Sequence, residues 1–154
     1  MDVAVEISQT GPDIVIENGD LRPDRGLRTA ALFSLFSDAR ATDEEIPTGD
    51  DPRGWWAEDA SQPWGSKLWL LARAKRTVET LELARGYARA AFDWAVAAGL
   101  CERVDVTTQY GSSGELEITI RPQRGSSRRW QHLWTGEKER IAELDGVLVR
   151  ILPD

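Results

Sequence analysis

Residues 66–99, "SKLWLLARAKRTVETLELARGYARAAFDWAVAAG", decide the fold because they carry the longest helical pattern of the chain. Apolar and small residues recur at spacings of three and four from Leu81 to Ala98, which indicates a helix packed closely on its neighbours. A single rod of this length would measure about 50 Å, more than a small domain needs. We therefore expect a break near residues 75–77, where a threonine offers a new N-cap, and an end at Gly99.

Strand patterns follow this helical region. Apolar residues alternate in "RVDVTTQY" (103–110) and in "ELEITIR" (115–121), and the "GSSG" between them is typical of a hairpin loop. "RRWQHLW" (128–134) fits either a third strand or a short helix, and we favour the strand. "RIAELDGVLVRIL" (140–152) predicts a closing hairpin that turns at its Asp-Gly pair, the strongest short turn signal in the chain.

The N-terminal side begins with a similar alternation. Two alternating runs flank "QTGPD", so residues 2–18 predict a hairpin. "NGDLRPDRG" (18–26) is expected to be a loop. Pro23 and Asp24 are suited to start a helix, and an amphipathic helix is expected over residues 24–39.

This order of elements predicts the fold class. Helices grouped between two β segments indicate a single α+β domain, with a mainly antiparallel sheet, an N-terminal hairpin and C-terminal strands, covered by two or three helices. We expect residues 1–135 to form the main body and residues 136–154 a C-terminal hairpin extension of the same domain. The terminal strands, residues 2–7 and 147–152, are expected at sheet edges, where they could accept a strand from a neighbour.

Composition narrows the functional classes. The 154-residue chain has a net charge of −7 and a pI near 4.8, which gives no electrostatic footprint for nucleic acid. Its one cysteine, Cys101, excludes an internal disulfide framework and a cysteine-based zinc site, and it favours folding in a reducing cytoplasm. The N-terminus lacks the pattern of a signal peptide, and no apolar run has the length of a membrane span.

The stretch "RGWWAEDASQPWGSKLWLL" (53–71) holds four of the seven tryptophans, at the end of a long acidic connection. Such long connections are usually functional or mobile. Exposed tryptophans would stack on sugars or anchor a protein interface. Buried ones would pin the connection to the helices. We interpret Trp55 and Trp56 as the anchor of this loop and Trp69 as part of the core or a groove.

A catalytic interpretation of this stretch finds little support. Glu58 and Asp59 have the residue types of a glycosidase pair, but adjacent side chains rarely point into one cleft. His132 is the only histidine, and no G-x-S-x-G or P-loop motif is present. We therefore expect no catalytic, cofactor or metal site. The alternative is a glycan-binding or peptidoglycan-active protein that uses the Trp-rich loop with Glu58 and Asp59.

A family resemblance connects these motifs. "NGDLRPDRGLRTAALFSLFSDARA" is followed by an acidic loop, "DPRGWWAE" and "GSKLWLLARAKRTVETLELARGYARAAFDWAVAAGL". This order, over residues 13–121, resembles the Mu-like phage tail protein family named after the product of Mu's gene 46. That family is similar to the lysozyme-like baseplate wedge proteins of contractile tails. Residues 136–154 have no place in this pattern; they fit an extra hairpin at the sheet edge or a partner-binding extension.

The resemblance implies a structural wedge subunit of a tail baseplate in the virion, not an enzyme. Its implied partners are other wedge subunits, spike or hub proteins and sheath proteins, without nucleic acid, membrane, cofactor or small-molecule substrate. In this hypothesis Arg53, Trp55, Trp56 and Trp64 order the long loop, and that loop or a β edge contacts the next subunit. The residues assigned to this structural or interface loop are Arg53, Trp55, Trp56, Trp64 and Trp69.

Overall fold

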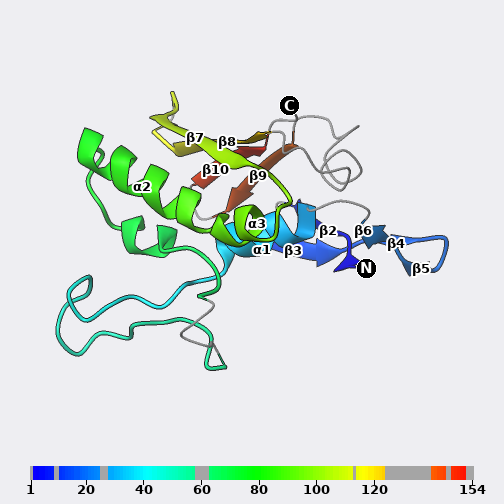
Figure 1. The fold of residues 1–154 in the computed structure, drawn as a ribbon, viewed down its shortest axis with the longest axis horizontal. Helices are drawn as coiled ribbons and strands as arrows, with labels where there is room; N and C mark the ends of the chain where they lie inside the picture. The colour runs from blue at the N-terminus through cyan, green and yellow to red at the C-terminus, as the bar shows by residue number, and fades with distance from the viewer. Residues whose placement is uncertain are drawn as a thin grey trace.

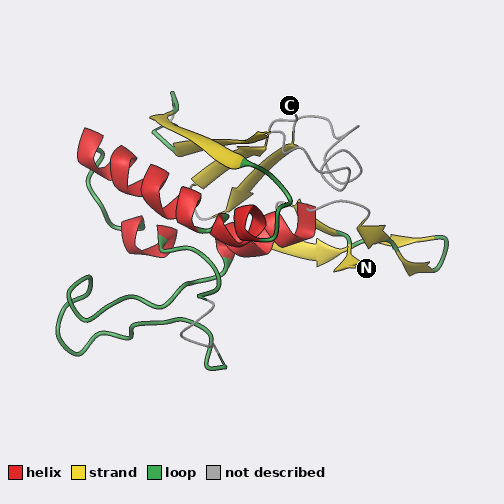
Figure 2. Ribbon diagram, in the orientation of Figure 1, coloured by secondary structure: helices red, strands yellow, loops and turns green. Residues whose placement is uncertain are grey.

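The computed structural model of the protein describes residues 2–8, 11–24, 28–57, 63–112, 114–123, 140–144 and 147–151. The sheet lies on one side of the helices and a long loop lies on the other (Figures 1 and 2). The elements in order are β1 (Asp2–Val3), β2 (Val5–Ser8), β3 (Gly11–Ile14), β4 (Ile16–Glu17), β5 (Asp20–Leu21), β6 (Pro23–Asp24), α1 (Arg28–Phe36), the 3-10 helix η1 (Leu68–Leu71), α2 (Val78–Ala90), α3 (Asp93–Ala97), β7 (Arg103–Tyr110), β8 (Leu116–Gln123), β9 (Arg140–Leu144) and β10 (Val147–Ile151). The predicted α+β class is confirmed.

The helical region is broken where the sequence predicts it. Thr77 is the N-cap of α2, and its hydroxyl accepts a hydrogen bond from the backbone N–H of Thr80 at 3.3 Å, which satisfies one of the free donors of the first turn. A second break separates α2 from α3 at Phe92, a fully buried residue. Gly99 follows the last helix with φ +68°, the left-handed conformation in which helices commonly end.

The main sheet has the order β7-β8-β10-β9. The β7–β8 and β9–β10 pairs are antiparallel, as predicted, whereas β8 and β10 pair in parallel with Ile118 opposite Val149. The expectation that residues 147–152 form a sheet edge is wrong, because β10 lies between β8 and β9. A pairing of β8 with β9 would have left β10 at the edge of the sheet. Two parallel strands need a long connection, and the chain between the end of β8 and the start of β10 is long enough to provide one.

The N-terminal segment forms three short ribbons. β2 pairs with β3 as the predicted hairpin, β4 pairs with β5, and β1 pairs with β6. Two expectations are therefore wrong: residues 18–26 are not simply a loop, and Pro23 and Asp24 form β6 instead of starting a helix. Asn18 and Gly19 have φ of +53° and +83°, the type I′ geometry that closes a tight hairpin. Backbone pairing with Asp2 and Val3 holds Pro23 and Asp24 extended.

The core lies between the helices and the sheet. The buried alanines of α2, Ala84 and Ala88, allow a close approach of this helix to β7 and β8. Alternate residues of β7 and β8 point into this core, which confirms the alternation seen in the sequence. The buried cluster comprises Ala31, Leu35, Leu68, Ala84, Ala88, Ala91, Phe92, Ala95, Leu100, Cys101, Val104, Val106, Leu116, Ile118 and Ile120.

Candidate functional site

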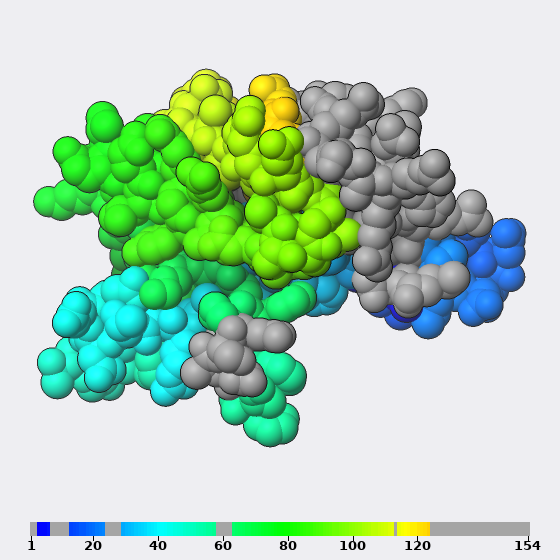
Figure 3. Space-filling view, in the orientation of Figure 1, coloured from blue at the N-terminus to red at the C-terminus, as the bar shows by residue number. Residues whose placement is uncertain are grey.

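The long loop between α1 and η1 is closed at its two ends by backbone hydrogen bonds. The N–H of Ser66 donates to the carbonyl oxygen of Ser37 at 2.8 Å, and the N–H of Ala39 donates to the carbonyl oxygen of Ser66 at 2.9 Å. These bonds form a parallel bridge between Asp38 and Ser66. The loop therefore leaves the helices and returns at one place, and Figure 3 shows it standing out from the body.

A buried serine and a glycine complete this closure. The Ser66 hydroxyl donates to the carbonyl oxygen of Leu35 at 2.6 Å and accepts from the N–H of Leu68 at 3.3 Å. Gly65 has φ +91°, and a Cβ at this position would collide with the carbonyl oxygen of Ser37. The closure thus requires a residue without a side chain at position 65.

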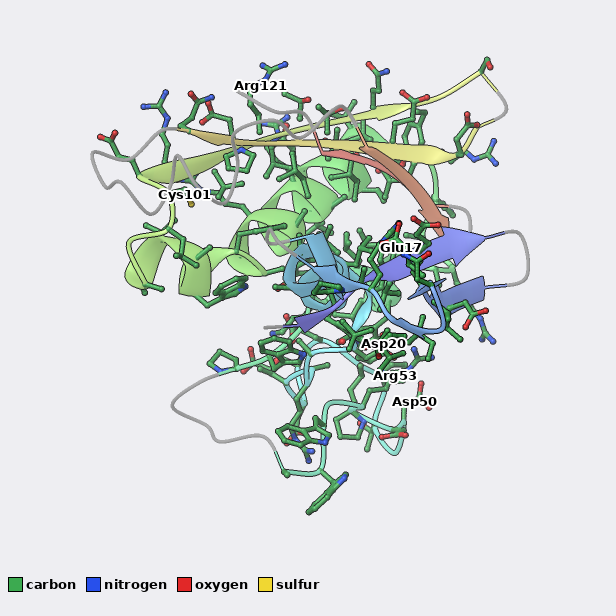
Figure 4. All side chains as sticks on the ribbon, turned by 90° about the vertical axis from the view of Figure 1, so that its right-hand side faces the viewer. Glu17, Asp20, Asp50, Arg53, Cys101 and Arg121 are labelled. Atoms are coloured by element: carbon green, nitrogen blue, oxygen red, sulfur yellow. The ribbon has the colours of Figure 1, made fainter. Side chains whose placement is uncertain are left out.

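Arg53 connects the middle of the loop to the helical layer. Its guanidinium lies over the Trp69 indole, 4.5 Å from the ring centroid, and its Nη1 is 2.8 Å from Oδ2 of Asp38. The Trp69 Nε1–H donates to the carbonyl oxygen of Ala39 at 2.9 Å. Arg53 itself has φ +54°, and the Asp51 carboxylate accepts its backbone N–H at 2.9 Å. Figure 4 shows Arg53 and Asp50 on the loop side of the molecule.

A second ion pair joins the acidic part of the loop to η1. The Glu45 carboxylate accepts from Lys67 Nζ at 2.7 and 3.0 Å and from the Thr42 N–H at 2.8 Å. The Lys67 ammonium is the main cause that lowers the pKa of Glu45 below its usual value, and the Thr42 N–H adds to it. The loop is therefore ordered by charge pairs and backbone bonds more than by apolar burial.

The tryptophans at the end of the loop are largely exposed. Trp55 is 56% exposed, Trp56 91% and Trp64 42%. The rings of Trp55 and Trp56 meet edge to face, with centroids 6.1 Å apart and planes at 62°. This exposure contradicts the alternative in which buried tryptophans pin the loop to the helices, and Arg53 and Trp69 supply a contact between the middle of the loop and η1.

The exposed rings border a hollow beside the end of α1. Its volume is about 620 Å³, and Trp55, Trp64 and Phe36 provide aromatic walls. Asp38, the ion-pair partner of Arg53, contributes a carboxylate. Gly54, with φ +87°, passes so close to Arg40 that an added Cβ would lie 2.7 Å from the Arg40 Cβ. The hollow can take an apolar or cationic side chain, since aromatic faces and a carboxylate suit both.

The candidate catalytic residues named from the sequence all belong to parts of the chain that the structure does not describe. Glu58, Asp59 and His132 lie outside the described residues, as do residues 128–134 and the turn of the last hairpin. Cys101 is buried, and this burial raises the pKa of its thiol. The described residues contain no group of acidic, histidine and cysteine side chains placed to bind a metal ion. No helix among them has the length and apolarity to cross a membrane.

The sequence pattern singles out Arg53 and Trp69 but not their partners. Asp38, which pairs with Arg53, lies 15 residues from it, and Ala39, whose carbonyl accepts from Trp69, lies 30 residues from it. Nothing in local spacing records such distant pairs. The glycine at position 65 is the only local signal, because it precedes a new helical pattern.

Comparison with known proteins gives a family for this arrangement. The family described as "Phage protein GP46" matches residues 27–128, which include the closed loop and both of its flanking helical segments. "Baseplate protein gp46" of Escherichia phage Mu is 40% identical over 122 residues, 77% of this chain and 84% of that protein. "Mu-like prophage FluMu protein gp46" of Haemophilus influenzae is 36% identical over 110 residues, 70% of this chain and 76% of that protein. The chain belongs to the phage protein GP46 family.

Proposed function

We propose that the protein is a structural component of a phage tail baseplate. We propose further that a neighbouring baseplate protein docks at the hollow that Trp55 and Trp64 border. The observation that carries this proposal is the exposure of Trp55, Trp56 and Trp64 on a loop that ion pairs hold in place. Tryptophan is enriched among residues that dominate interface energies. A loop ordered before binding also loses less conformational entropy when the partner docks. The name of the Mu relative, "Baseplate protein gp46", supports the assignment to a baseplate.

The more specific proposal is a wedge subunit of a contractile tail without enzymatic activity. Its partners would be larger wedge subunits, the spike or hub and the sheath, and the protein would reside in the virion tail after folding in the host cytoplasm. Residues Arg53 and Trp69 would hold the loop, and Trp55, Trp56 and Trp64 would contact the neighbour.

The test is genetic complementation of tail assembly. The gene is deleted from the tail gene cluster that encodes it, and the wild type or a variant is supplied in trans. The double variant Trp55→Ala/Trp56→Ala is expected to reduce the number of intact tails by about tenfold or more, as loss of an interface anchor does. The matched control is Val78→Ala/Leu83→Ala, which truncates two exposed apolar side chains on α2.

Two further measurements are needed, the stability of the Trp variant and the presence of the wild-type chain in tails. The free energy of unfolding of the isolated Trp variant should lie within about 0.5 kcal/mol of the wild-type value, because the two side chains are mostly exposed. Mass spectrometry of purified tails should detect the wild-type chain in the baseplate. Absence of the chain from tails, or full assembly with the Trp variant, would overturn the proposal.

A glycan-binding function is the second candidate, because the hollow combines aromatic walls with a carboxylate. The 62° angle between Trp55 and Trp56 speaks against it, since two rings at this angle do not make a flat platform for a sugar. Titration with peptidoglycan oligosaccharides, followed by tryptophan fluorescence, separates the two. Saturable quenching that disappears in Trp55→Ala, or lysis lost in Glu58→Gln/Asp59→Asn, would favour the glycan.

A further inference from the structure

A short hairpin at the other side of the molecule has no role in the proposal above. We define the arm as residues 16–21, which comprise β4, the turn at Asn18 and Gly19, and β5. It projects from the body along the long axis, away from the tryptophan loop (Figure 1). Two paired residues on each side are too few to form a stable hairpin alone, so its conformation depends on its base.

The base of the arm is fixed by backbone hydrogen bonds among Ala4, Val15 and Arg22, the single residues that separate β1 from β2, β3 from β4 and β5 from β6. The N–H of Ala4 donates to the carbonyl of Arg22 at 2.8 Å, that of Val15 to Ala4 at 3.0 Å, and that of Arg22 to Val15 at 2.8 Å. The buried Thr29 of α1 then holds the chain on both sides of Ala4, because its hydroxyl donates to the Val3 carbonyl at 2.9 Å and accepts from the Val5 N–H at 3.3 Å. The arm is therefore attached to the helical layer in a defined direction.

The two faces of the arm differ in chemistry. Ile16 pairs directly with Leu21, and their side chains are 66% and 46% exposed. Glu17 pairs directly with Asp20, so two carboxylates lie opposite each other on the other face. Figure 4, which looks toward this end of the molecule, labels both acids.

Neither face of the arm has a composition that is favourable for a surface exposed only to solvent. Like charges placed directly across a ribbon destabilise it, and exposed apolar strand residues promote association. Among the described residues, Glu17 and Asp20 make no ion pair, and the nearest arginine in sequence, Arg22, pairs with Glu6 at 2.6 Å. A partner that offers apolar contact and positive charge would satisfy both faces at once.

We propose that the arm inserts into an apolar groove lined by lysine or arginine side chains on a second baseplate protein. Ile16 and Leu21 would fill the groove, while Glu17 and Asp20 would pair with its cations. A second copy of this chain is a poor occupant, because its net charge of −7 would repel the acidic face. This inference rests on the proposed baseplate function and adds a separate contact, so that the protein would bridge two neighbours.

The test uses the same complementation system with full-length chains. Glu17→Gln/Asp20→Asn neutralises the acidic face, and Ile16→Ser/Leu21→Ser makes the apolar face polar. Val78→Ser/Leu83→Ser is the matched control, with two exposed apolar residues on α2 changed in the same way. Incorporation into tails is measured by quantitative mass spectrometry, at low and at high salt during assembly.

A merely structural arm and a docking arm predict opposite results for the acidic pair. Removal of the repulsion should leave the melting temperature of the isolated protein unchanged or raised. Incorporation into tails should nevertheless fall by about tenfold, and it should lose its sensitivity to salt. Ile16→Ser/Leu21→Ser should also reduce incorporation, while the α2 control should not.

Three outcomes would overturn the inference. They are normal incorporation of both arm variants, equal losses with the α2 control, and a wild-type dimer in sedimentation that the arm variants dissolve. The wild-type chain is measured in the same tails. Its presence with unaffected arm variants rejects the arm alone, whereas its absence rejects the baseplate function itself.

Discussion

At the scale of single residues, Arg53 joins parts of the structure that are distant in sequence. It pairs with Asp38 at the end of α1 and covers the Trp69 ring in η1. A non-glycine residue with φ +54° costs on the order of 1 kcal/mol. The Asp38 pair is about half exposed and therefore contributes less than about 1 kcal/mol. The Trp69 ring is thus the more important of the two side-chain partners that hold Arg53 in this conformation.

The variant Trp69→Phe tests this conclusion. Phenylalanine keeps an aromatic surface under Arg53 but cannot donate the hydrogen bond to the Ala39 carbonyl. The free energy of unfolding should fall by about 1–2 kcal/mol for two reasons. The part-buried Ala39 carbonyl loses its hydrogen-bond donor, and phenylalanine gives Arg53 a weaker cation–π contact than tryptophan does. Denaturant unfolding measures the change. Trp56→Phe, at a 91% exposed position, is the control and should have no effect; equal losses in both variants would refute the role of Trp69.

At the scale of elements, the closed loop depends on a close approach of two backbone segments. Gly65 and Gly49 both have positive φ, +91° and +93°. A side chain at position 65 would meet the Ser37 carbonyl, whereas position 49 has open space around it. The two glycines therefore separate the cost of backbone conformation from the cost of a collision.

We expect Gly49→Ala to reduce the free energy of unfolding by about 1 kcal/mol, the cost of alanine in the left-handed region. Gly65→Ala should cost at least about 2 kcal/mol more, because the bridge between Asp38 and Ser66 must open or shift. Amide hydrogen exchange should show faster exchange of the Ala39 and Ser66 N–H groups in Gly65→Ala alone. Equal losses in the two variants would show that the approach to Ser37 does not constrain the fold.

Local sequence signals predict the elements well where the pattern is complete within one segment. The break before α2 follows from Thr77, and the alternation of β7 and β8 follows from their apolar residues. The turn at Asn18 and Gly19 has an equally local signal, but the prediction of a loop there overlooked it. Pro23 was a misleading signal, because its fixed φ suits a strand edge as well as a helix start.

At the scale of the whole molecule, the C-terminal hairpin completes the sheet. β10 pairs with β8 along five residues, from Val147 opposite Leu116 to Ile151 opposite Ile120. Ile118 and Ile120 are fully buried in the core on which this pairing borders. The hairpin is thus the continuation of the sheet at β8.

Removal of residues 140–154 should abolish cooperative folding or leave an insoluble chain. The truncation exposes the backbone groups of β8 that pair with β10, and an open strand of this length promotes aggregation. Circular dichroism and thermal unfolding of the soluble fraction measure the effect. A truncated chain that melts within a few degrees of the full-length protein would show that the hairpin is an appendage. The matched comparison is Ile16→Ser/Leu21→Ser, which alters a projecting ribbon and should melt near the wild type.

Local signals in the sequence predict the α+β class, the break before α2 and the β2–β3, β7–β8 and β9–β10 hairpins, because periodicity, caps and turn residues act between near neighbours. The order of the motifs along the chain carries the resemblance to the family. Only the tertiary structure decided that β10 lies beside β8, since alternation marks the buried face of a strand but not its neighbour. It also decided that Trp69 is covered while Trp56 is exposed. Both tryptophans belong to one short stretch of sequence. The difference arises because Asp38 pairs with Arg53 and the Ala39 carbonyl accepts from Trp69, and both partners are distant in sequence.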